Sequence, residues 1–224
     1  MFDAMPDDCL PHIIFDHWEA HRLPALRAAI THKDPDTFGH CTRVAALSVE
    51  LGEALGLDAR ARQILRVGAE LHDVGKTDIP SGILLKPGKL NDDERRIMNT
   101  HSALGAQIIL ACTDPIGEEI ALVVRHHHEH YDGSGYPDGL ASMEIPYLAR
   151  IVAIADCYDA LTMDRPYRAP FSHARAMHIM CEERGTTLDP NLVDRFGIVI
   201  ADSPHRAAQD LNSAATRLAS AFTR

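Results

Sequence analysis

Apolar residues repeat at helical spacing along most of this chain. One such stripe lies in residues 37–57 and consists of Val44, Leu47, Leu51 and Leu55. Steps of three and four residues place these side chains on one face of a helix. Residues 145–164 are apolar around most of their circumference, as expected of a central buried helix. No stretch alternates apolar and polar residues over the length of a strand, so the sequence predicts a compact all-α bundle.

Capping signals divide the chain into further helices. A first helix is expected over residues 10–30, ending before a break at Pro35, and a third over residues 59–76. Asn91 and Glu94 have the spacing of an N-cap and its capping-box partner, and predict one helix that also carries His101. Three later helices are expected to begin at Ser172, Asp189 and Ser203.

Charge and cysteine content limit the class of function. The formal net charge of -10 excludes electrostatic binding of a nucleic-acid polymer, which requires a basic face. Five cysteines without paired spacing indicate neither a disulfide framework nor a zinc knuckle. The acidic N-terminus does not resemble a signal peptide, and the longest uncharged run, residues 102–113, is too short to span a membrane. We therefore expect a cytoplasmic protein that makes no membrane contact.

Residues that commonly bind metals lie on or at the ends of the expected helices. They come from five helical segments and are Asp36, His40, His72, Asp73, His101, His127, His128 and Asp156. Side chains that converge from facing helices are a recurrent way to build a metal site in a helical bundle. Imidazole with carboxylate suits iron, manganese, zinc or nickel. The residue types thus indicate a metal centre in the bundle core.

Each of these residues also has a simpler explanation when taken alone. Asp36 and His40 are four residues apart and fit an exposed pair on one helix face. An imidazole at the end of a helix, as at His72, interacts favourably with the helix dipole. Asp156 is different because it lies within an apolar helix, where an unpaired charge costs several kcal/mol. That carboxylate requires a partner, and a cation shared with the histidines would supply one.

Four motifs in this order resemble the HD-GYP group of HD-domain metal-dependent phosphohydrolases, whose members typically hydrolyse cyclic di-GMP. They are HDVGK (residues 72–76), THSALG around His101, HHEHYDGSGYP (127–137) and ADCYDALTMDRPYR (155–168). The resemblance covers about residues 34–189. It implies an N-terminal flanking helix (1–33), an HD-GYP catalytic domain (34–200) whose GYP loop lies beside a buried metal site, and a C-terminal helix (201–224) packed on that domain.

The resemblance also implies a role for each candidate ligand. His72 and Asp73 match the HD pair, with Asp73 bridging two metals, and Asp156 would complete the first site with His40. His101 and His127 would hold the second metal, and His128 would be a further ligand. His126 and His130 match no ligand of the family and are expected at the surface.

The metal centre is expected to contain two divalent cations, with iron or manganese favoured and zinc or nickel as alternatives. Asp36 stands where three-metal members of the family have a glutamate, and its shorter side chain puts a third metal in doubt. A metal pair can lower the pKa of a bridging water and hold the phosphate oxygens. The hydroxide formed from that bridging water would attack phosphorus, so no separate base is needed.

The substrate pocket is expected beside this centre. By resemblance, Lys76 contacts the scissile phosphate, Tyr136 faces a guanine or ribose, and Asp159 contacts a guanine. Arg165 and Arg168 carry guanidinium groups that suit phosphate or the guanine edge. The alternatives are structural: Lys76 as a solvated helix-end lysine, and Arg165 paired with Asp164 or Asp132 to hold the loop.

These features predict a metal-dependent phosphodiesterase that opens cyclic di-GMP to linear pGpG, with GMP as a further product. One alternative keeps the chemistry and changes the substrate, for example to cyclic GMP-AMP. The other is a signalling module that binds a nucleotide without turnover. The expected partners are a cyclic dinucleotide and either a second subunit or a separate regulator, because no sensor domain is visible in the first 33 residues.

Overall fold

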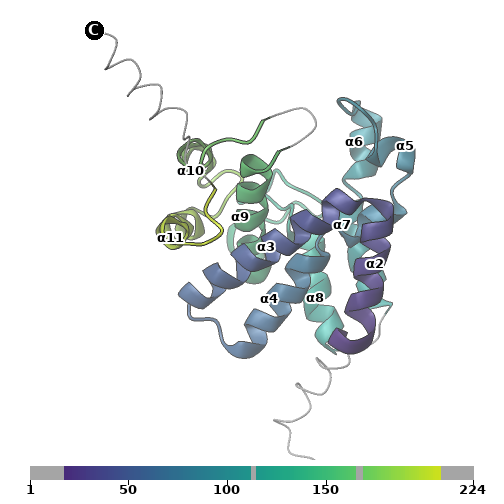
Figure 1. Cartoon of the computed structure of the whole chain (residues 1–224), viewed down its shortest axis with the longest axis horizontal. Coiled ribbons are helices and arrows are strands. Elements are labelled where there is room, and N and C mark those ends of the chain that lie inside the picture. Colours follow the sequence, from purple (N-terminus) through teal and green to yellow (C-terminus); the bar gives the residue numbers. More distant parts are fainter. Residues whose placement is uncertain (1–17, 112–114, 165–168, 208–224) are drawn as a thin grey trace, which may run out of the picture.

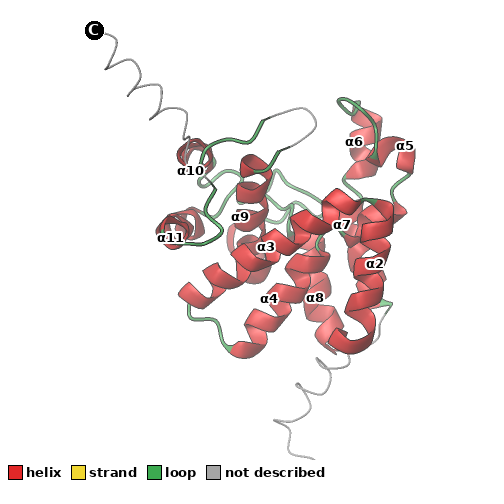
Figure 2. Cartoon of the chain, viewed as in Figure 1, coloured by secondary structure: helices red, strands yellow, loops and turns green. Residues whose placement is uncertain are grey.

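The computed structural model describes residues 18–111, 115–164 and 169–207, and within them the chain is helical with no β-strand (Figure 2). The α-helices are α2 (Leu23–Lys33), α3 (Pro35–Ala54), α4 (Ala59–Leu71), α5 (Ser81–Leu84), α6 (Asp92–Met98), α7 (His101–Leu110), α8 (Pro115–His126), α9 (Tyr147–Thr162), α10 (His173–Glu182) and α11 (Pro190–Ala201). Shorter helical segments are η1 (Trp18–Arg22), η2 (Val74–Asp78) and η3 (Ser142–Glu144). The predicted all-α fold is confirmed.

Helix α9 lies at the centre of the bundle. It packs against α3, α4, α8, α10 and α11, and its buried side chains include Ile151, Val152 and Ile154. Helices α10 and α11 lie at one end of the molecule, whereas α5 and α6 project from the other (Figure 1). Because α9 contacts helices from both halves of the sequence, it brings residues 156 and 159 close to α3.

Helix α3 begins earlier than the sequence indicates. Pro35 was expected to interrupt the pattern, but it occupies the first turn of α3, where its missing N–H group costs little. Asp34 is the N-cap, and its side chain accepts hydrogen bonds from the Asp36 N–H at 3.1 Å and the Thr37 hydroxyl at 2.7 Å. The aspartate next to Pro35 therefore starts the helix that carries His40.

Helix α4 ends earlier than predicted. The expected helix over residues 59–76 stops at Leu71, and the chain continues into η2. At Gly75 the backbone lies so close to α7 that an added Cβ atom would be 1.9 Å from the His101 carbonyl oxygen. Only glycine permits this approach, which brings the segment after Asp73 against the start of α7.

The predicted helix from Asn91 through His101 is two helices. The capping box of Asn91 and Glu94 is present, with an Asn91 side chain that accepts the Glu94 N–H at 2.9 Å. Helix α6 ends at Met98, however, and α7 begins at His101. Asn99 and Thr100, which have low helix propensity, form the break. His101 therefore lies in the first turn of a helix that packs along η2 and α8.

Two of the three N-cap residues predicted for the last helices of the chain are confirmed. Ser172 and Asp189 cap α10 and α11 through their side chains. The helix predicted to begin at Ser203 does not form in residues 203–207, and the rest of that segment lies outside the described residues. The division of the chain at residues 33 and 200 stays a prediction. Within the described part of the chain, no helix has both the length and the hydropathy to cross a membrane.

Candidate metal centre

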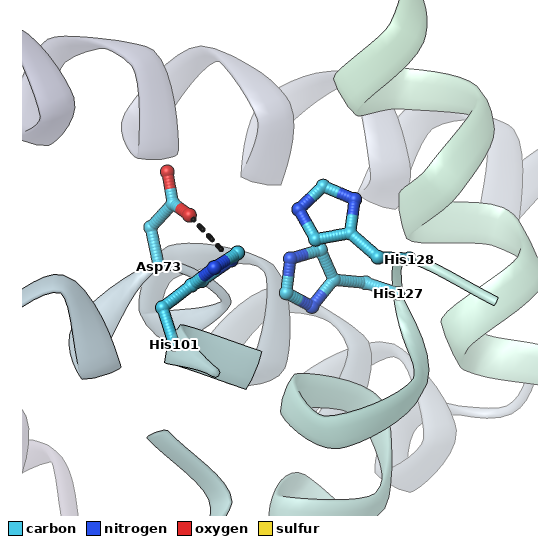
Figure 3. Close-up of side chains that lie close together, drawn as sticks. All are labelled: Asp73, His101, His127 and His128. Carbon is cyan, nitrogen blue, oxygen red and sulfur yellow. Dashed lines mark ion pairs between the residues drawn. The ribbon is translucent and has the colours of Figure 1, made fainter. Parts of the chain in front are cut away.

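Seven of the eight predicted ligands converge between the helices. Helix α3 supplies His40, the end of α4 supplies His72 and Asp73, α7 supplies His101, the end of α8 supplies His127 and His128, and α9 supplies Asp156. All are buried or partly buried. Figure 3 shows four of them, Asp73, His101, His127 and His128, directed toward one another.

Asp73 belongs to two groups of ligand atoms. One group contains Asp73, His101, His127 and His128, and the other contains His40, His72 and Asp73. In each group the ligand atoms lie within 4.8 Å of one another. Asp73 Oδ1 is 3.3 Å from His101 Nε2, whereas Asp73 Oδ2 is 3.5 Å from His72 Nε2. The two carboxylate oxygens therefore face different groups, as a bridging ligand requires.

Asp156 adjoins the second group. Its Oδ1 atom lies 3.1 Å from Nε2 of His40, and the same Nε2 atom is 3.9 Å from Asp73 Oδ2. The Asp156 side chain retains 17% of its exposure, so it lies at the edge of the centre. The sequence predicted that Asp156, within an apolar helix, needs a partner, and the His40 ring is one such partner.

Backbone hydrogen bonds orient the buried imidazoles. The Nδ1 atoms of His72, His101 and His127 each donate to the carbonyl oxygen three residues earlier, at 2.7, 2.8 and 2.7 Å. This fixes the tautomer whose lone pair is at Nε2. The Nε2 atoms of His101 and His127 are buried and have no hydrogen-bond partner. A buried polar atom without a partner is costly, so these residues fit a metal ion.

The ionisation states also suit metal binding. Burial lowers the pKa of His72 and His127, and it lowers the pKa of His128 to about 3, so all three rings are neutral. Burial alone would raise the pKa of Asp73, but the positive charge of Lys76 and the nearby imidazoles hold it well below its usual range. Neutral imidazoles and an ionised carboxylate are the forms that bind metals.

His40 is the exception among these imidazoles. Burial lowers its pKa, but hydrogen bonds to Asp156 and Asp159, together with their charges and that of Asp73, raise it to about 9. A metal ion at Nε2 would take the place of that proton. The His40 ring is thus the one held mainly by carboxylates.

Lys76 lies directly beside Asp73. Its Nζ atom is 2.6 Å from Asp73 Oδ2, and the side chain is 25% exposed. Burial would lower the pKa of Lys76, but the Asp73 charge raises it, so the ammonium group is retained. The simpler interpretation, a solvated lysine at a helix end, does not describe this contact.

The GYP loop covers one side of the centre. Gly133 has a φ of +84°, and a Cβ atom at Gly135 would be 2.2 Å from the backbone nitrogen of His130. These glycines therefore permit the turn and close approach that the sequence indicated. The Tyr136 ring lies 4.9 Å from the His128 ring, between centroids, and is partly exposed. Tyr136 is thus placed to meet a molecule that enters the centre.

A second cluster, consisting of His126, Glu129 and Asp138, holds this loop. Glu129 is buried, and its carboxylate accepts the N–H groups of Asp138 at 2.8 Å and Leu140 at 3.1 Å. His126 was expected at the surface, but it is buried with Nδ1 3.4 Å from Glu129 Oε1. That expectation was wrong because the loop folds back over the end of α8. Glu129 was not predicted as a functional residue, although it lies within the HHEHYDGSGYP motif.

Four predicted site residues either belong to neither group of ligand atoms or lie outside the described residues. Asp36 is exposed in the first turn of α3 and belongs to neither group of ligand atoms. Arg165 and Arg168 lie outside the described residues. Asp159 is buried, and its oxygens are engaged by His40 and Arg43, which leaves it poorly placed for the predicted guanine contact. Arg43 was not singled out in the sequence.

Comparisons with known proteins identify the family of this chain. A family model for the HD domain matches residues 24–192. The chain is 40% identical over 176 residues to the cyclic di-GMP phosphodiesterase response regulator RpfG of Xanthomonas campestris pv. campestris, covering 79% of this chain and 47% of that protein. It is also 40% identical over 168 residues to the 3'3'-cGAMP-specific phosphodiesterase 3 of Vibrio cholerae, covering 75% of this chain and 36% of that protein.

A solved structure shows the same fold. The HD domain of the L. monocytogenes phosphodiesterase PgpH, in complex with cyclic-di-AMP, matches with a TM-score of 0.56 and 20% identity. The match covers 78% of this chain and 92% of that chain. At this identity the likeness shows the fold alone.

Fold and site together define an all-helical domain with a candidate divalent-metal centre between its helices. The chain belongs to the HD domain family, in its HD-GYP group. It spans less than half the length of the two curated relatives named above. The HD superfamily implies divalent metal binding, and the two groups of ligand atoms give that property a location.

Proposed function

We propose that this chain is a metal-dependent phosphodiesterase that hydrolyses cyclic di-GMP to linear pGpG. The observation that carries the proposal is the pair of ligand groups that share Asp73, within which two buried imidazole nitrogens have no hydrogen-bond partner. The curated relative at 40% identity whose name includes cyclic di-GMP supports this substrate class.

The residues fit two divalent cations, and we assign these as iron or manganese, with zinc or nickel as alternatives, because mixed imidazole and carboxylate sets suit these metals. Such a pair supplies ionised water at neutral pH and neutralises charge on phosphate oxygens. His40, His72 and Asp156 would hold one cation, and His101, His127 and His128 the other. Asp73 would contact both, because its two oxygens face the two groups.

The proposed reaction adds water across one P–O3′ bond of the cyclic dinucleotide. The oxygen of water bonds to phosphorus, the P–O3′ bond breaks, and O3′ receives a proton, which gives pGpG. Lys76 is the cation placed to contact a phosphate oxygen, since it is partly exposed and lies 2.6 Å from Asp73 Oδ2. Tyr136 would pack against a base or ribose at the entrance.

Cyclic GMP-AMP is a second candidate substrate. The 40% identity to a 3'3'-cGAMP-specific phosphodiesterase favours it, because the two cyclic dinucleotides share the ring that Lys76 and the ligand groups would contact. The two differ in one purine. Comparison of kcat/KM for both compounds, measured with the same metal-loaded preparation, separates the candidates.

The experiment that tests the proposed function combines metal loading with product analysis. The protein is purified anaerobically, supplemented with iron or manganese, incubated with cyclic di-GMP and analysed by chromatography. We expect pGpG to accumulate, with GMP appearing later if the linear product is cleaved again. A His126→Gln variant is the matched control, because His126 lies next to the ligands but belongs to the second cluster.

Two results would contradict the proposal. Bound metal without cleavage of cyclic di-GMP would assign the centre to another substrate, and cyclic GMP-AMP would be assayed next. Absence of both metal and cleavage would favour a module that binds a nucleotide without turnover.

A further inference from the structure

His40 is held differently from the other buried imidazoles. Its Nδ1 atom lies 2.7 Å from Oδ2 of Asp159, a residue 119 positions later on α9. Backbone carbonyl oxygens orient the rings of His72, His101 and His127, as described above, and a carbonyl carries no net charge. Only this ring, among those four, has a carboxylate at Nδ1.

Asp159 is itself held by a second residue. Arg43, one turn after His40 on α3, places Nε 2.6 Å from Asp159 Oδ1 and Nη2 3.0 Å from Oδ2. Asp159 is buried, with 3% exposure, whereas the Arg43 side chain is 38% exposed. The two-point contact fixes the plane of the carboxylate, and the guanidinium charge offsets the cost of burying it.

The geometry points to Asp159 and Arg43 as a positioning pair for His40, and this inference rests on the metal centre of the proposed function. Asp159 accepts the Nδ1 proton, which makes Nε2, 3.1 Å from Asp156 Oδ1, the ring nitrogen that a cation can take in place of a proton. A carboxylate at this position also makes the imidazole a stronger metal ligand. Arg43 keeps the carboxylate ionised and aimed at the ring.

This arrangement gives the two metal positions different supports. The position formed by His40, His72 and Asp156 depends on Asp159 and Arg43. The position formed by His101, His127 and His128 does not contact either residue in any hydrogen bond or ion pair of the described residues. Loss of the pair should therefore weaken one metal position selectively, whereas a general loss of stability would weaken both.

The test is a titration of the full chain with Mn²⁺ under anaerobic conditions, in which isothermal titration calorimetry measures the affinity of each bound equivalent. In the Asp159→Asn variant we expect the affinity for one of two Mn²⁺ equivalents to fall by about 10-fold to 100-fold. The affinity for the other equivalent should stay unchanged. The Arg43→Gln variant should show a smaller loss at the same equivalent, and Arg43→Lys should restore part of it.

The matched control is Asp189→Asn. Asp189 on α11 forms a comparable buried ion pair with Arg150 of α9, with Nη1 2.6 Å from Oδ2, but it contacts none of the ligand residues. This variant should lower the melting temperature and leave both Mn²⁺ affinities unchanged. Circular dichroism confirms that each variant is folded before titration.

Three results would overturn the inference. Equal effects of Asp159→Asn on both equivalents, or no effect on either, would return Asp159 and Arg43 to a structural or substrate-contacting role. A wild-type chain that binds no Mn²⁺ would overturn the metal centre as well. Two bound Mn²⁺ ions without phosphodiesterase activity would contradict the proposed function and leave the positioning role standing.

Discussion

Two clusters of histidine and carboxylate meet at the end of α8, and they differ in how their polar atoms are satisfied. In the cluster around Asp73, the Nε2 atoms of His101 and His127 have no hydrogen-bond partner, although His101 Nε2 lies 3.3 Å from Asp73 Oδ1. In the cluster around Glu129, the carboxylate already accepts two backbone N–H groups. Asp138, its third member, is bound by Arg125 through two contacts at 2.8 and 2.6 Å. The first cluster therefore keeps lone pairs that a cation can use, whereas the second acts as a clasp that holds the GYP loop closed.

Residue type alone therefore does not identify a metal site. Both clusters contain side chains whose ligand atoms lie within 4.8 Å of one another. What separates them is the number of lone pairs that protein donors already use.

Asp73→Ala should remove the ligand that the two groups share. We expect bound metal to fall from about two per chain to less than one, and activity to fall about 1000-fold or more, because a metal pair contributes several kcal/mol to such reactions. Helicity should persist in circular dichroism, since no apolar side chain of the core is removed. Full activity in this variant would refute the bridging role.

Glu129→Ala should open the clasp instead. It removes the acceptor of two backbone N–H groups, so we expect the free energy of unfolding to fall by about 2 to 4 kcal/mol, measured by urea denaturation. Glu129→Gln keeps one carbonyl acceptor and should cost less. Metal content should stay at the wild-type level in the Gln variant, and a loss of metal there would show that the two clusters are not independent.

Tyr136→Ala should affect substrate binding more than metal binding. The ring lies 4.9 Å from His128 at the partly exposed entrance, so its loss removes an apolar contact for a base. We expect KM for cyclic di-GMP to rise by about 10-fold, as for loss of about 1.4 kcal/mol, with little change in kcat. An unchanged KM in steady-state kinetics would exclude the stacking role.

Asp36→Ala should have the smallest effect. Asp36 is exposed in the first turn of α3, so its removal should change the free energy of unfolding by about 0.5 kcal/mol or less. Elemental analysis should find the same metal content as in the wild-type chain. Loss of one metal equivalent would instead restore Asp36 to the ligand set that the family resemblance implies.

Much of the candidate site could be predicted from local sequence. The capping pair Asn91 and Glu94 is a local signal, and the structure confirms it. The break after Met98 had a local signal in Asn99 and Thr100, which have low helix propensity. The break after Leu71 could not be predicted, because it depends on packing. Gly75 approaches α7 closely only after distant segments meet.

The support of His40 was also hidden in the sequence, but a signal existed. Arg43 follows His40 by three residues, and Asp159 follows Asp156 by three, so each pair shares one helix face. The sequence did not show that these two helix faces pack together, since the contact between His40 and Asp159 joins residues 119 positions apart. The burial of His126 was missed for a different reason: it depends on how the following loop folds back onto Glu129, which the sequence pattern does not show.

We expect the Asp73 cluster, and not the Glu129 cluster, to bind metal. Anomalous diffraction from crystals of the full chain loaded with Mn²⁺ locates the bound ions. We expect two anomalous peaks, one beside His40 and His72 and one beside His101 and His127, and no peak at Glu129. A peak at Glu129, or none beside Asp73, would contradict the account.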